Sequence, residues 1–302
     1  MKRKTTQLKE MLESPEVLVM PGCYDALSAR LIELAGFKAI QCSGFGFAAS
    51  ILCKPDIGLL TFPEMLAQTR NVVNAVSIPV MADGDTGFGN AINVTRTVKE
   101  FEAMGAAGIN LEDQFFPKRC GHMEGKQIIS KEEMLGKIRA AAEARTDPDF
   151  IINARTDAVA VSGVDEAIER GNAYAEAGAD LIFGEAPTEI DEIKRMIREI
   201  HAPVSINLFD GVHGGKTPLV PIKELESWGV ARISIPVGVT FAAVRGVKNY
   251  LEALAKSPDG LAAGRGDLVV SFDEFKELVG LPEIRKLENK YLPPTTIKAK
   301  YG

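Results

Sequence analysis

A unit that recurs four times constrains the fold of this chain more than any other feature. In each copy an amphipathic run ends near a glycine and is followed directly by an apolar, strand-like run. Glycine readily adopts the left-handed conformation that closes a helix, so each copy predicts a helix-to-strand joint. The four copies are residues 34–40, 103–109, 176–182 and 227–233.

Four further apolar runs lie between these copies, which gives eight strand-like segments alternating with helical ones. The additional runs are residues 17–20, 79–82, 150–154 and 203–206. Short, almost entirely apolar strands separated by helices are typical of a parallel sheet buried on both faces. Eight such units in about 250 residues favour a (β/α)8 TIM barrel. The alternative is an open Rossmann-like sheet, but no GxGxxG motif follows the first strand.

The predicted barrel spans residues 1–256 and begins with a lead helix over 5–13. A C-terminal helical extension is expected over 257–302, with capped helices at 271–278 and 282–290. A barrel does not need these residues. They can cover either the barrel itself or a neighbouring subunit, and the sequence pattern does not choose between the two.

The composition excludes several classes of partner. A net charge of −6 and a pI near 5.4 argue against nucleic acid, whose binding depends on phosphate neutralisation by Lys and Arg. No stretch reaches the ~20 apolar residues that span a bilayer, and no signal-like apolar run follows the basic start. The four cysteines are far apart and form no CxxC pair, which favours reduced thiols in the cytoplasm.

The segment 112–126 is the most informative for chemistry. It leaves an apolar strand at Glu112 and continues as a glycine-containing loop in which Lys118, Arg119 and His122 surround one thiol, Cys120. Positive charge lowers the pKa of a thiol, so we expect Cys120 to exchange protons near neutral pH. A nucleophilic thiol is the alternative, but no His–Asp pair is spaced for a relay.

Carboxylates at neighbouring strand ends predict a metal site. Asp83 and Asp85 are two residues apart after the third strand, so both side chains can face one point. Asp56 and Glu112 belong to neighbouring strand ends. Converging carboxylates repel one another unless a cation neutralises them, and oxygen ligands suit Mg²⁺ or Mn²⁺. The alternative is an Asp-rich turn whose carboxylates cap the next helix.

Two further strand ends carry side chains that suit anion binding. Arg155 directly follows the fifth strand, where a guanidinium could clamp a carboxylate or stabilise an enolate. The alternative for Arg155 is a structural ion pair with Asp157 or Glu185. Asn207 ends the seventh strand and offers neutral donors, unless it caps a helix.

These motifs stand in an order that resembles the isocitrate lyase/phosphoenolpyruvate mutase superfamily, and most closely its short lyase branch of 2,3-dimethylmalate and 2-methylisocitrate lyases. The resemblance covers roughly residues 5–290, and the KRCGH element is its most specific part. The matching elements are Ser43-Gly44-Phe45-Gly46, residues 83–90, Glu112-Asp113-Gln114, residues 117–122 and residues 154–157.

The resemblance implies a role for each matching residue. Asp83 would bind Mg²⁺ directly, while Asp85, Asp56 and Glu112 would hold the water ligands of the metal. Cys120 would be the general acid on a closing loop. The remaining implied residues contact the substrate: Ser43, Gly44, Gly46 and Arg155 at its pyruvate half, Arg119, Gly121, His122, Glu185 and Asn207 near its second carboxylate, and Tyr24 near its oxygen.

The resemblance further implies a carbon–carbon lyase that cleaves a 2-hydroxydicarboxylate to pyruvate and a carboxylic acid. Tyr24 or a metal-bound water would take the 2-hydroxyl proton. No additional Arg or Lys is evident at a strand end for a third carboxylate, which favours a four-carbon dicarboxylate backbone. The alternatives are an oxaloacetate hydrolase and a catalytically silent barrel that serves as a binding or assembly protein. The family also implies a homotetramer in which C-terminal helices are swapped between subunits.

Overall fold

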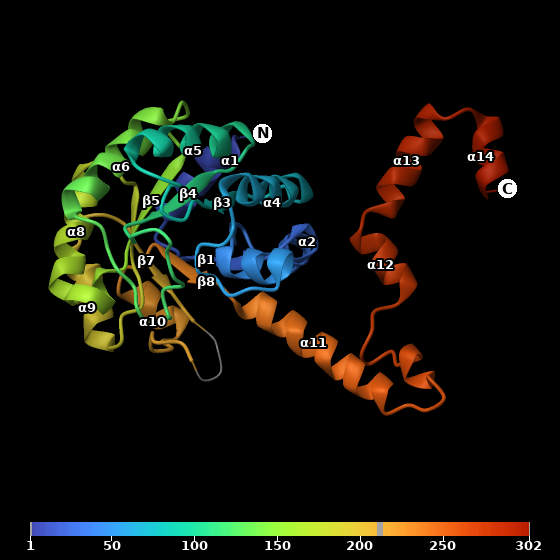
Figure 1. Cartoon of the computed structure of the whole chain (residues 1–302). Helices are drawn as coiled ribbons and strands as arrows, with labels where there is room; N and C mark the ends of the chain where they lie inside the picture. The colour runs from blue at the N-terminus through green and yellow to red at the C-terminus, as the bar shows by residue number, and fades with distance from the viewer. Residues whose placement is uncertain (1, 210–213, 302) are drawn as a thin grey trace. The chain divides into compact units, whose positions relative to one another are not determined.

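The computed structural model describes residues 2–209 and 214–301. Its centre is a closed barrel of eight parallel strands, each paired with the next and β8 with β1 (Figure 1). This confirms the predicted (β/α)8 fold. The strands are β1 (Leu18–Cys23), β2 (Ile40–Cys42), β3 (Val80–Asp83), β4 (Gly108–Glu112), β5 (Ile151–Thr156), β6 (Leu181–Gly184), β7 (Val204–Asn207) and β8 (Arg232–Ile235).

Helices surround the barrel and cover the outer faces of its strands (Figure 1). The predicted lead helix is present one residue earlier than expected, as α1 (Lys4–Leu12). The other helices up to β8 are α2 (Ala26–Leu34), α3 (Gly44–Phe47), the π-helical η1 (Ala48–Leu52), α4 (Phe62–Ala75), α5 (Ala91–Ala103), α6 (Lys131–Ala144), α7 (Ala158–Ser162), α8 (Val164–Glu176), α9 (Ile190–Glu199) and α10 (Ile222–Ser227).

Two helix caps decide between the alternatives that the sequence left open. Asn90 caps α5 by accepting a hydrogen bond from Ile92 N at 2.9 Å, so Asp83 and Asp85 are not the caps of that helix. The helix after β7 begins at Ile222 with Pro221 before it, so Asn207 is not a helix cap either. The side chains of Asp83, Asp85 and Asn207 are therefore not used to cap helices, and they are available for binding or catalysis.

The end of the barrel opposite the predicted site is closed by α1. Leu8 and Leu12 of this helix are buried with Leu18, Met20 and Met81, together with other apolar residues near the starts of the strands. A larger apolar cluster fills the layer between the strands and the surrounding helices. Because apolar side chains occupy these regions, the polar residues are left to the carboxyl ends of the strands.

The register of the strands brings those polar residues to one level. Asp83 pairs with Asn110, and Glu112 pairs with Arg155 on the next strand. Asn207 is opposite Ser234 of β8. Parallel strands in this register carry their last residues to the same rim, so residues distant in sequence become neighbours at the barrel mouth.

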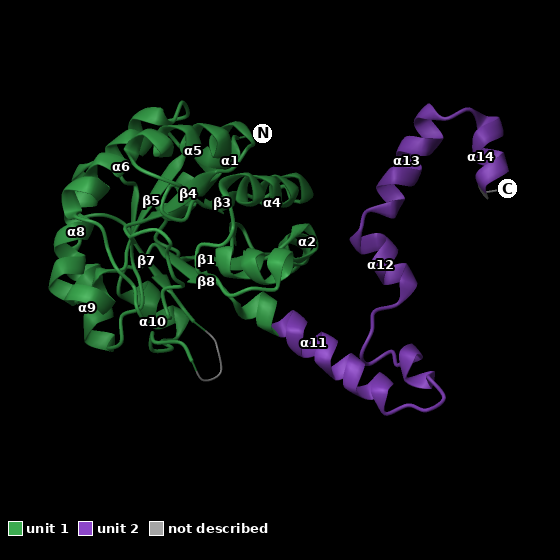
Figure 2. Cartoon of the chain, in the orientation of Figure 1, with its two compact units in different colours: residues 1–241 green, residues 242–302 purple. Residues whose placement is uncertain are grey.

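The chain divides into two compact units, Met1–Phe241 and Ala242–Gly302 (Figure 2). The boundary lies inside α11 (Gly238–Ala255), earlier than the predicted boundary at residue 256, because most side chains of this helix from Phe241 onward are exposed. Unit 2 continues with the short 3₁₀ segment η2 (Leu261–Gly264), α12 (Phe272–Leu278), α13 (Leu281–Tyr291) and α14 (Pro294–Tyr301).

Helices α12 and α13 confirm the predicted helices at 271–278 and 282–290. The third, α14, was not predicted, since Pro293-Pro294 was interpreted as a terminator. Proline is well tolerated in the first turn of a helix, where its missing N–H costs nothing, and this explains why α14 begins at Pro294. Within the described residues, no helix combines the length and apolar character needed to cross a membrane.

Candidate functional site

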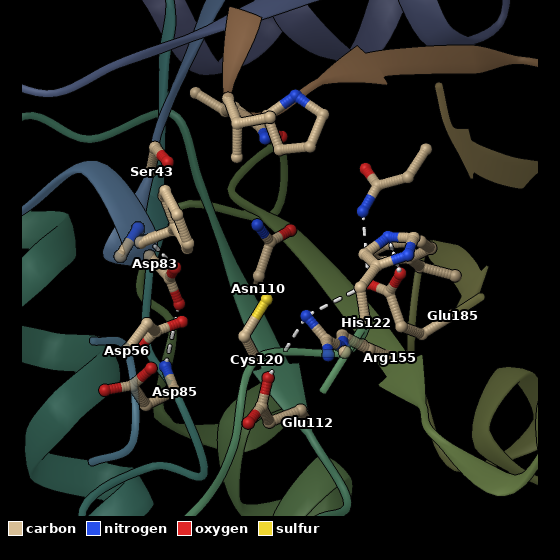
Figure 3. A pocket seen from close by; sticks show the side chains of 18 of the residues that line it. Ser43, Asp56, Asp83, Asp85, Asn110, Glu112, Cys120, His122, Arg155 and Glu185 are labelled. Atoms are coloured by element: carbon tan, nitrogen blue, oxygen red, sulfur yellow. Dashed lines mark hydrogen bonds and ion pairs between the residues drawn. The ribbon is translucent and has the colours of Figure 1, made fainter. Parts of the chain in front are cut away.

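The first group at the barrel mouth consists of Asp56, Asp83, Asp85 and Lys118, which we call the acidic side (Figure 3). Asp83 is fixed by backbone donors, because its Oδ2 accepts from Gly44 N at 2.9 Å and its Oδ1 from Asp85 N at 3.0 Å. A Cβ at position 44 would lie 2.6 Å from Asp83 Oδ2. Only glycine therefore allows the backbone of α3 to approach this carboxylate.

Lys118 reaches the acidic side from the loop after β4. Its Nζ lies 2.7 Å from Asp56 Oδ1 and 2.8 Å from Asp85 Oδ1, and its side chain is almost fully buried. Burial raises the pKa of Asp85 to about 7, because Lys118 only partly offsets desolvation and the charges of the neighbouring carboxylates. Burial alone would lower the pKa of Lys118, but Asp56 and Asp85 raise it well above its usual value.

Glu112 lies between the acidic side and Arg155. Its Oε2 is 3.4 Å from Arg155 Nη1, and its Oε1 is buried with no hydrogen-bond partner among the described residues. Burial raises the pKa of Glu112 well above its usual value, although Arg155 and Lys118 lower it. A buried carboxylate oxygen without a donor is costly, and it is suited to accept a hydrogen bond from a bound water or ligand.

The second group consists of Arg155, Glu185 and His122 at the cavity (Figure 3), with Asp157 as the ion-pair partner of Arg155, and we call these four residues the arginine side. Asp157 holds Arg155 in a bidentate pair, from Nε to Oδ2 at 2.9 Å and from Nη2 to Oδ1 at 3.0 Å. Arg155 Nη1 also lies 3.1 Å from Glu185 Oε2. The structural ion pairs considered for Arg155 are thus both present, and the guanidinium still lines the cavity.

Glu185 connects this side to the loop and to β7. Its Oε1 lies 3.2 Å from His122 Nε2, and its Oε2 accepts from Asn207 Nδ2 at 3.1 Å. Burial would raise the pKa of Glu185, but Arg155 and His122 outweigh it and lower the pKa to about 2. His122 is itself oriented by Lys216, whose backbone N–H donates to Nδ1 at 3.0 Å.

Cys120 lies between the two sides and lines the cavity (Figure 3). Burial raises the pKa of its thiol to about 11, and the charges of Asp56 and Glu185 act in the same direction. The predicted lowering of this pKa is therefore wrong. The loop cations do not stabilise a thiolate, because Lys118 is paired with carboxylates of the barrel and Arg119 is exposed.

The two sides enclose a cavity of about 60 Å³, several times the ~10–15 Å³ that one water needs. Most of the predicted site residues line it. They are Ser43, Gly44, Asp56, Asp83, Asp85, Glu112, Cys120, Gly121, His122, Arg155, Glu185 and Asn207.

Three predicted residues are not among the described residues that line the cavity. Gly46 donates its N–H to Ser43 Oγ at 3.1 Å and supports the site from behind. A Cβ at position 46 would lie 2.7 Å from Cβ of Tyr24, so Tyr24 packs behind this glycine. Arg119 is exposed, and its backbone is held by Gln114, with Arg119 N donating to Gln114 Oε1 at 2.9 Å.

Several residues of the site were not predicted. Lys118 was predicted only as a neighbour of the Cys120 thiol, and the carboxylates with which it pairs depend on the folded loop. Asp157 was considered only as an alternative ion-pair partner of Arg155. Phe183 and Phe209 line the cavity as apolar walls. The only sequence signal for these two residues was that each lies two positions from a polar residue at a strand end.

Arg232 in β8 is a buried polar residue that the sequence analysis treated as part of a helix-to-strand joint. Its guanidinium donates to Ser205 Oγ at 3.1 Å and to Gln41 Oε1, and Gln41 lines the cavity. No carboxylate among the described residues forms an ion pair with it, and burial lowers its pKa to about 9. The floor of the site is therefore polar and carries positive charge.

The donor set of the acidic side fits a hard divalent cation with few direct ligands. Within residues 2–209 and 214–301, no three His, Cys, Asp or Glu side chains are close enough to enclose a metal by themselves. Mg²⁺ commonly takes one or two carboxylates and keeps several waters. Three acids with one lysine, and the donor-free oxygen of Glu112, agree with that kind of coordination.

Comparison with known proteins places these residues in a family context. The model of the phosphoenolpyruvate phosphomutase family matches residues 8–255. The 2,3-dimethylmalate lyase of Eubacterium barkeri is 47% identical over 285 residues, covering 94% of this chain and 97% of that protein. The 2-methylisocitrate lyase of Escherichia coli K12 is 44% identical over 281 residues, covering 92% and 93%.

Solved structures give the same result. A 2,3-dimethylmalate lyase described as a PEP mutase/isocitrate lyase superfamily member aligns with a TM-score of 0.88 and 33% identity, covering 96% of both chains. An oxaloacetate acetylhydrolase with 3,3-difluorooxalacetate aligns at 0.87 and 30%, covering 95% and 96%. A phosphonopyruvate hydrolase with oxalate and Mg²⁺ aligns at 0.86 and 33%, covering 97% and 100%.

Proposed function

The chain belongs to the PEP mutase/isocitrate lyase superfamily and is a carbon–carbon lyase, and from that premise we propose that it cleaves a 2-hydroxydicarboxylate. The products would be pyruvate and a carboxylic acid, from a substrate of the 2,3-dimethylmalate kind, with the tricarboxylate 2-methylisocitrate as the less favoured substrate. One observation carries the proposal. The thiol of Cys120 lies between a group of carboxylates suited to a cation and a guanidinium suited to an anion.

Arg155 would bind and orient the pyruvate half of the substrate. Asp157 fixes its Nε and Nη2, so the guanidinium is held in one orientation before substrate arrives. Preorganised donors of this kind stabilise charge that develops on a substrate oxygen when the C2–C3 bond breaks. Ser43 and Gly44 also line the cavity and would contact the same half of the substrate.

Cys120 would deliver the proton that the reaction requires. When the 2-hydroxyl loses its proton, for which Tyr24 or a metal-bound water would be the acceptor, C2 becomes the carbonyl of pyruvate and the electron pair of the C2–C3 bond is left on C3. The adjacent carboxylate stabilises this electron pair, and the thiol proton would then transfer to C3. A thiol whose pKa is raised to about 11 is fully protonated near neutral pH, which suits a general acid. Asn207 and His122 both contact Glu185, and these three residues would form the wall next to the second carboxylate.

The acidic side would hold Mg²⁺, or Mn²⁺ in its place. Asp83 is proposed as the direct ligand, and Asp85, Asp56 and Glu112 as acceptors for the waters of the metal. The metal would supply a Lewis acid that polarises the 2-oxygen of the substrate. The excess of carboxylates over Lys118 supports this assignment, and so does the related phosphonopyruvate hydrolase solved with oxalate and Mg²⁺.

The cations of the cavity favour a dicarboxylate over a tricarboxylate. Among the described lining residues the fixed cations are Lys118 and Arg155, with His122 beside Glu185. Arg119, the remaining loop cation of the KRCGH element, is exposed. A third carboxylate would lack a partner, and burying an unpaired charge is costly. We therefore propose a four-carbon backbone with a methyl substituent on C2, because the C1–C2 half of the substrate becomes pyruvate only when C2 carries that methyl group.

A panel of 2-hydroxy- and 2-oxo-dicarboxylates with product identification tests the proposal. We expect 2,3-dimethylmalate to release pyruvate, detected by a coupled lactate dehydrogenase reaction. Chelation should abolish turnover, and added Mg²⁺ should restore it. Absence of turnover on every substrate, in protein that binds Mg²⁺, would instead favour a catalytically silent barrel with a binding role.

A second candidate is hydrolysis of oxaloacetate to acetate and oxalate at the same site. The observation in its favour is the likeness to the oxaloacetate acetylhydrolase structure, which shares the fold over nearly the whole chain. The same panel separates the two functions, because oxaloacetate would then give oxalate and acetate, and the 2-hydroxydicarboxylates would give no pyruvate.

We also propose that the chain forms a cytoplasmic homotetramer in which unit 2 packs on a neighbouring subunit by helix exchange. The supporting observation is the apolar surface of unit 2, where Phe272 is 77% exposed and Val279, Ile284 and Leu287 are each at least half exposed. Sedimentation analysis should give a tetramer for the intact chain. Phe272→Asp combined with Leu287→Asp should reduce it to smaller species, and an unchanged tetramer would contradict this role.

A further inference from the structure

Lys126 is a buried cation of the loop to which no role has yet been given. Its side chain is 2% exposed, and its Nζ lies 3.0 Å from Asp157 Oδ1. The same ammonium donates to the carbonyl of Gly121. Lys126 thus ties the backbone next to Cys120 to the end of β5. Lysine is almost never buried to this extent unless its charge is paired.

Asp157, the partner of Lys126, is the carboxylate that also orients Arg155. Its Oδ1 accepts from Arg155 Nη2 at 3.0 Å, and is shared with Lys126 Nζ. Asp157 is rigidly placed, because its backbone N–H donates to the buried Asp113 at 2.9 Å. One fixed carboxylate therefore binds both a loop residue and the guanidinium that faces the cavity.

Gly121 shows how tightly the loop fits when this contact is made. A Cβ at position 121 would lie 2.4 Å from Glu185 Cγ and 2.7 Å from Arg155 Nη2. The backbone at Gly121 therefore lies directly against the arginine side. Displacing it would move Cys120, the preceding residue, away from its place between the two sides of the mouth.

We propose that Lys126 is a positioning residue that latches the loop through Asp157 and so couples the placement of Cys120 to the orientation of Arg155. The proposed placement of the loop rests only on the contacts of Lys126, Asp157 and Gly121. The expected effect on turnover rests on the proposed lyase function. When the latch opens, Cys120 leaves the cavity and Asp157 retains only Arg155.

A second lysine offers a matched control. Lys216 Nζ pairs with Glu124 of the same loop at 2.7 Å, but the Glu124 side chain is 90% exposed. Exposed ion pairs contribute little, because water screens the charges and both side chains lose freedom. Lys216→Met removes one lysine–carboxylate contact of the loop, as Lys126→Met does, but leaves the buried latch intact.

Alkylation of Cys120 by iodoacetamide, followed by peptide mass spectrometry, measures loop opening without reference to activity. Cys53 is exposed and provides an internal reference in the same molecule. We expect Lys126→Met to raise the Cys120 rate relative to the Cys53 rate by about tenfold, because local opening exposes the thiol and removes the burial that raises its pKa. Lys216→Met should leave this ratio within about twofold of the parent chain.

Turnover is measured on the same proteins with the best substrate of the panel. Lys126→Met should lower kcat by about 100-fold, while Lys126→Arg, which keeps the charge, should recover part of it. An unchanged Cys120 ratio would overturn the latch. A raised ratio with unchanged kcat would overturn its coupling to Arg155.

Two further outcomes are informative. If the parent chain itself shows no lyase turnover, the proposed function fails while the alkylation ratio still decides the latch. If Lys126→Met does not give a folded barrel by circular dichroism, Lys126→Gln replaces it with the same expectations, since a neutral amide removes the charge that pairs with Asp157.

Discussion

The two sides of the barrel mouth contain the same types of charged residue but differ in the balance between cations and anions. On the acidic side, Asp56, Asp83 and Asp85 face one lysine, which leaves two carboxylates in excess. On the arginine side, Asp157 and Glu185 face Arg155, and Lys126 of the loop pairs with Asp157 as well, which is two cations for two anions. The acidic side therefore favours an additional cation, and the arginine side is balanced.

The difference lies in where the compensating charge comes from. Arg155 and Asp157 are at the same strand end and hold one another through two hydrogen bonds. Lys118 reaches Asp56 and Asp85 from the loop. A cation on a loop can move away from its partners when the loop moves, whereas a cation on a strand stays in place. The acidic side is thus suited to exchange its cation, and the arginine side to hold an anion in fixed geometry.

Cys120→Ser tests the residue between the two sides and should have the largest effect. We expect kcat to fall about 1,000-fold, because a serine hydroxyl is a far weaker acid than even a thiol with a pKa near 11. Mg²⁺ binding, measured by calorimetry, should not change. Near-normal turnover in this variant would remove Cys120 from the proton transfer.

Arg155→Lys tests the fixed geometry of the arginine side. The charge is retained, but an ammonium cannot make the bidentate contact with Asp157 and face the cavity at once. We expect kcat/KM to fall about 100-fold. The comparison between the two sides would be weakened if the lysine variant kept most of its activity, since charge alone would then be sufficient.

Glu185→Gln tests the charge balance of the arginine side by its effect on the free energy of unfolding. The folded-state pKa of Glu185, about 2, is below its ordinary value of 4.5, so its charge stabilises the fold above pH 4.5. That contribution is lost as the pH falls from 4.5 towards 2. The parent chain should be more stable than the variant by at most about 3 kcal/mol near neutral pH.

Thermal unfolding across a pH series measures this difference. The gap in Tm between the parent chain and Glu185→Gln should be widest near neutral pH and should narrow below about pH 4. A gap that stays constant with pH would mean that packing, and not charge, accounts for the effect of the substitution.

Lys118→Met tests the acidic side and should have the smallest effect. Without the ammonium beside Asp56 and Asp85, the carboxylates should bind Mg²⁺ about tenfold more tightly. Calorimetric titration with Mg²⁺ at mildly alkaline pH keeps the carboxylates ionised, and Lys216→Met is the control for removing a lysine. Weaker Mg²⁺ binding would show that Lys118 supports the metal site instead of competing for it.

Much of this site could be predicted from the sequence because it lies at strand ends. Asp83, Glu112, Arg155 and Asn207 each terminate or adjoin an apolar run, and parallel strands of a barrel bring such residues to one rim. Gly44 was implied by the family resemblance, and its close contact with Asp83 explains why no larger residue fits. These positions could be predicted because they follow from local sequence pattern and from the repeated helix-to-strand unit.

The tertiary structure alone decided what the loop residues do. It separated Lys118, which is buried among carboxylates, from its neighbour Arg119, which is exposed, and it reversed the expected direction of the Cys120 pKa. The physical reason is that a strand fixes where its side chains point, whereas a loop does not. In the loop, burial and ion pairing depend on contacts with residues distant in sequence, and these exist only after the barrel has closed.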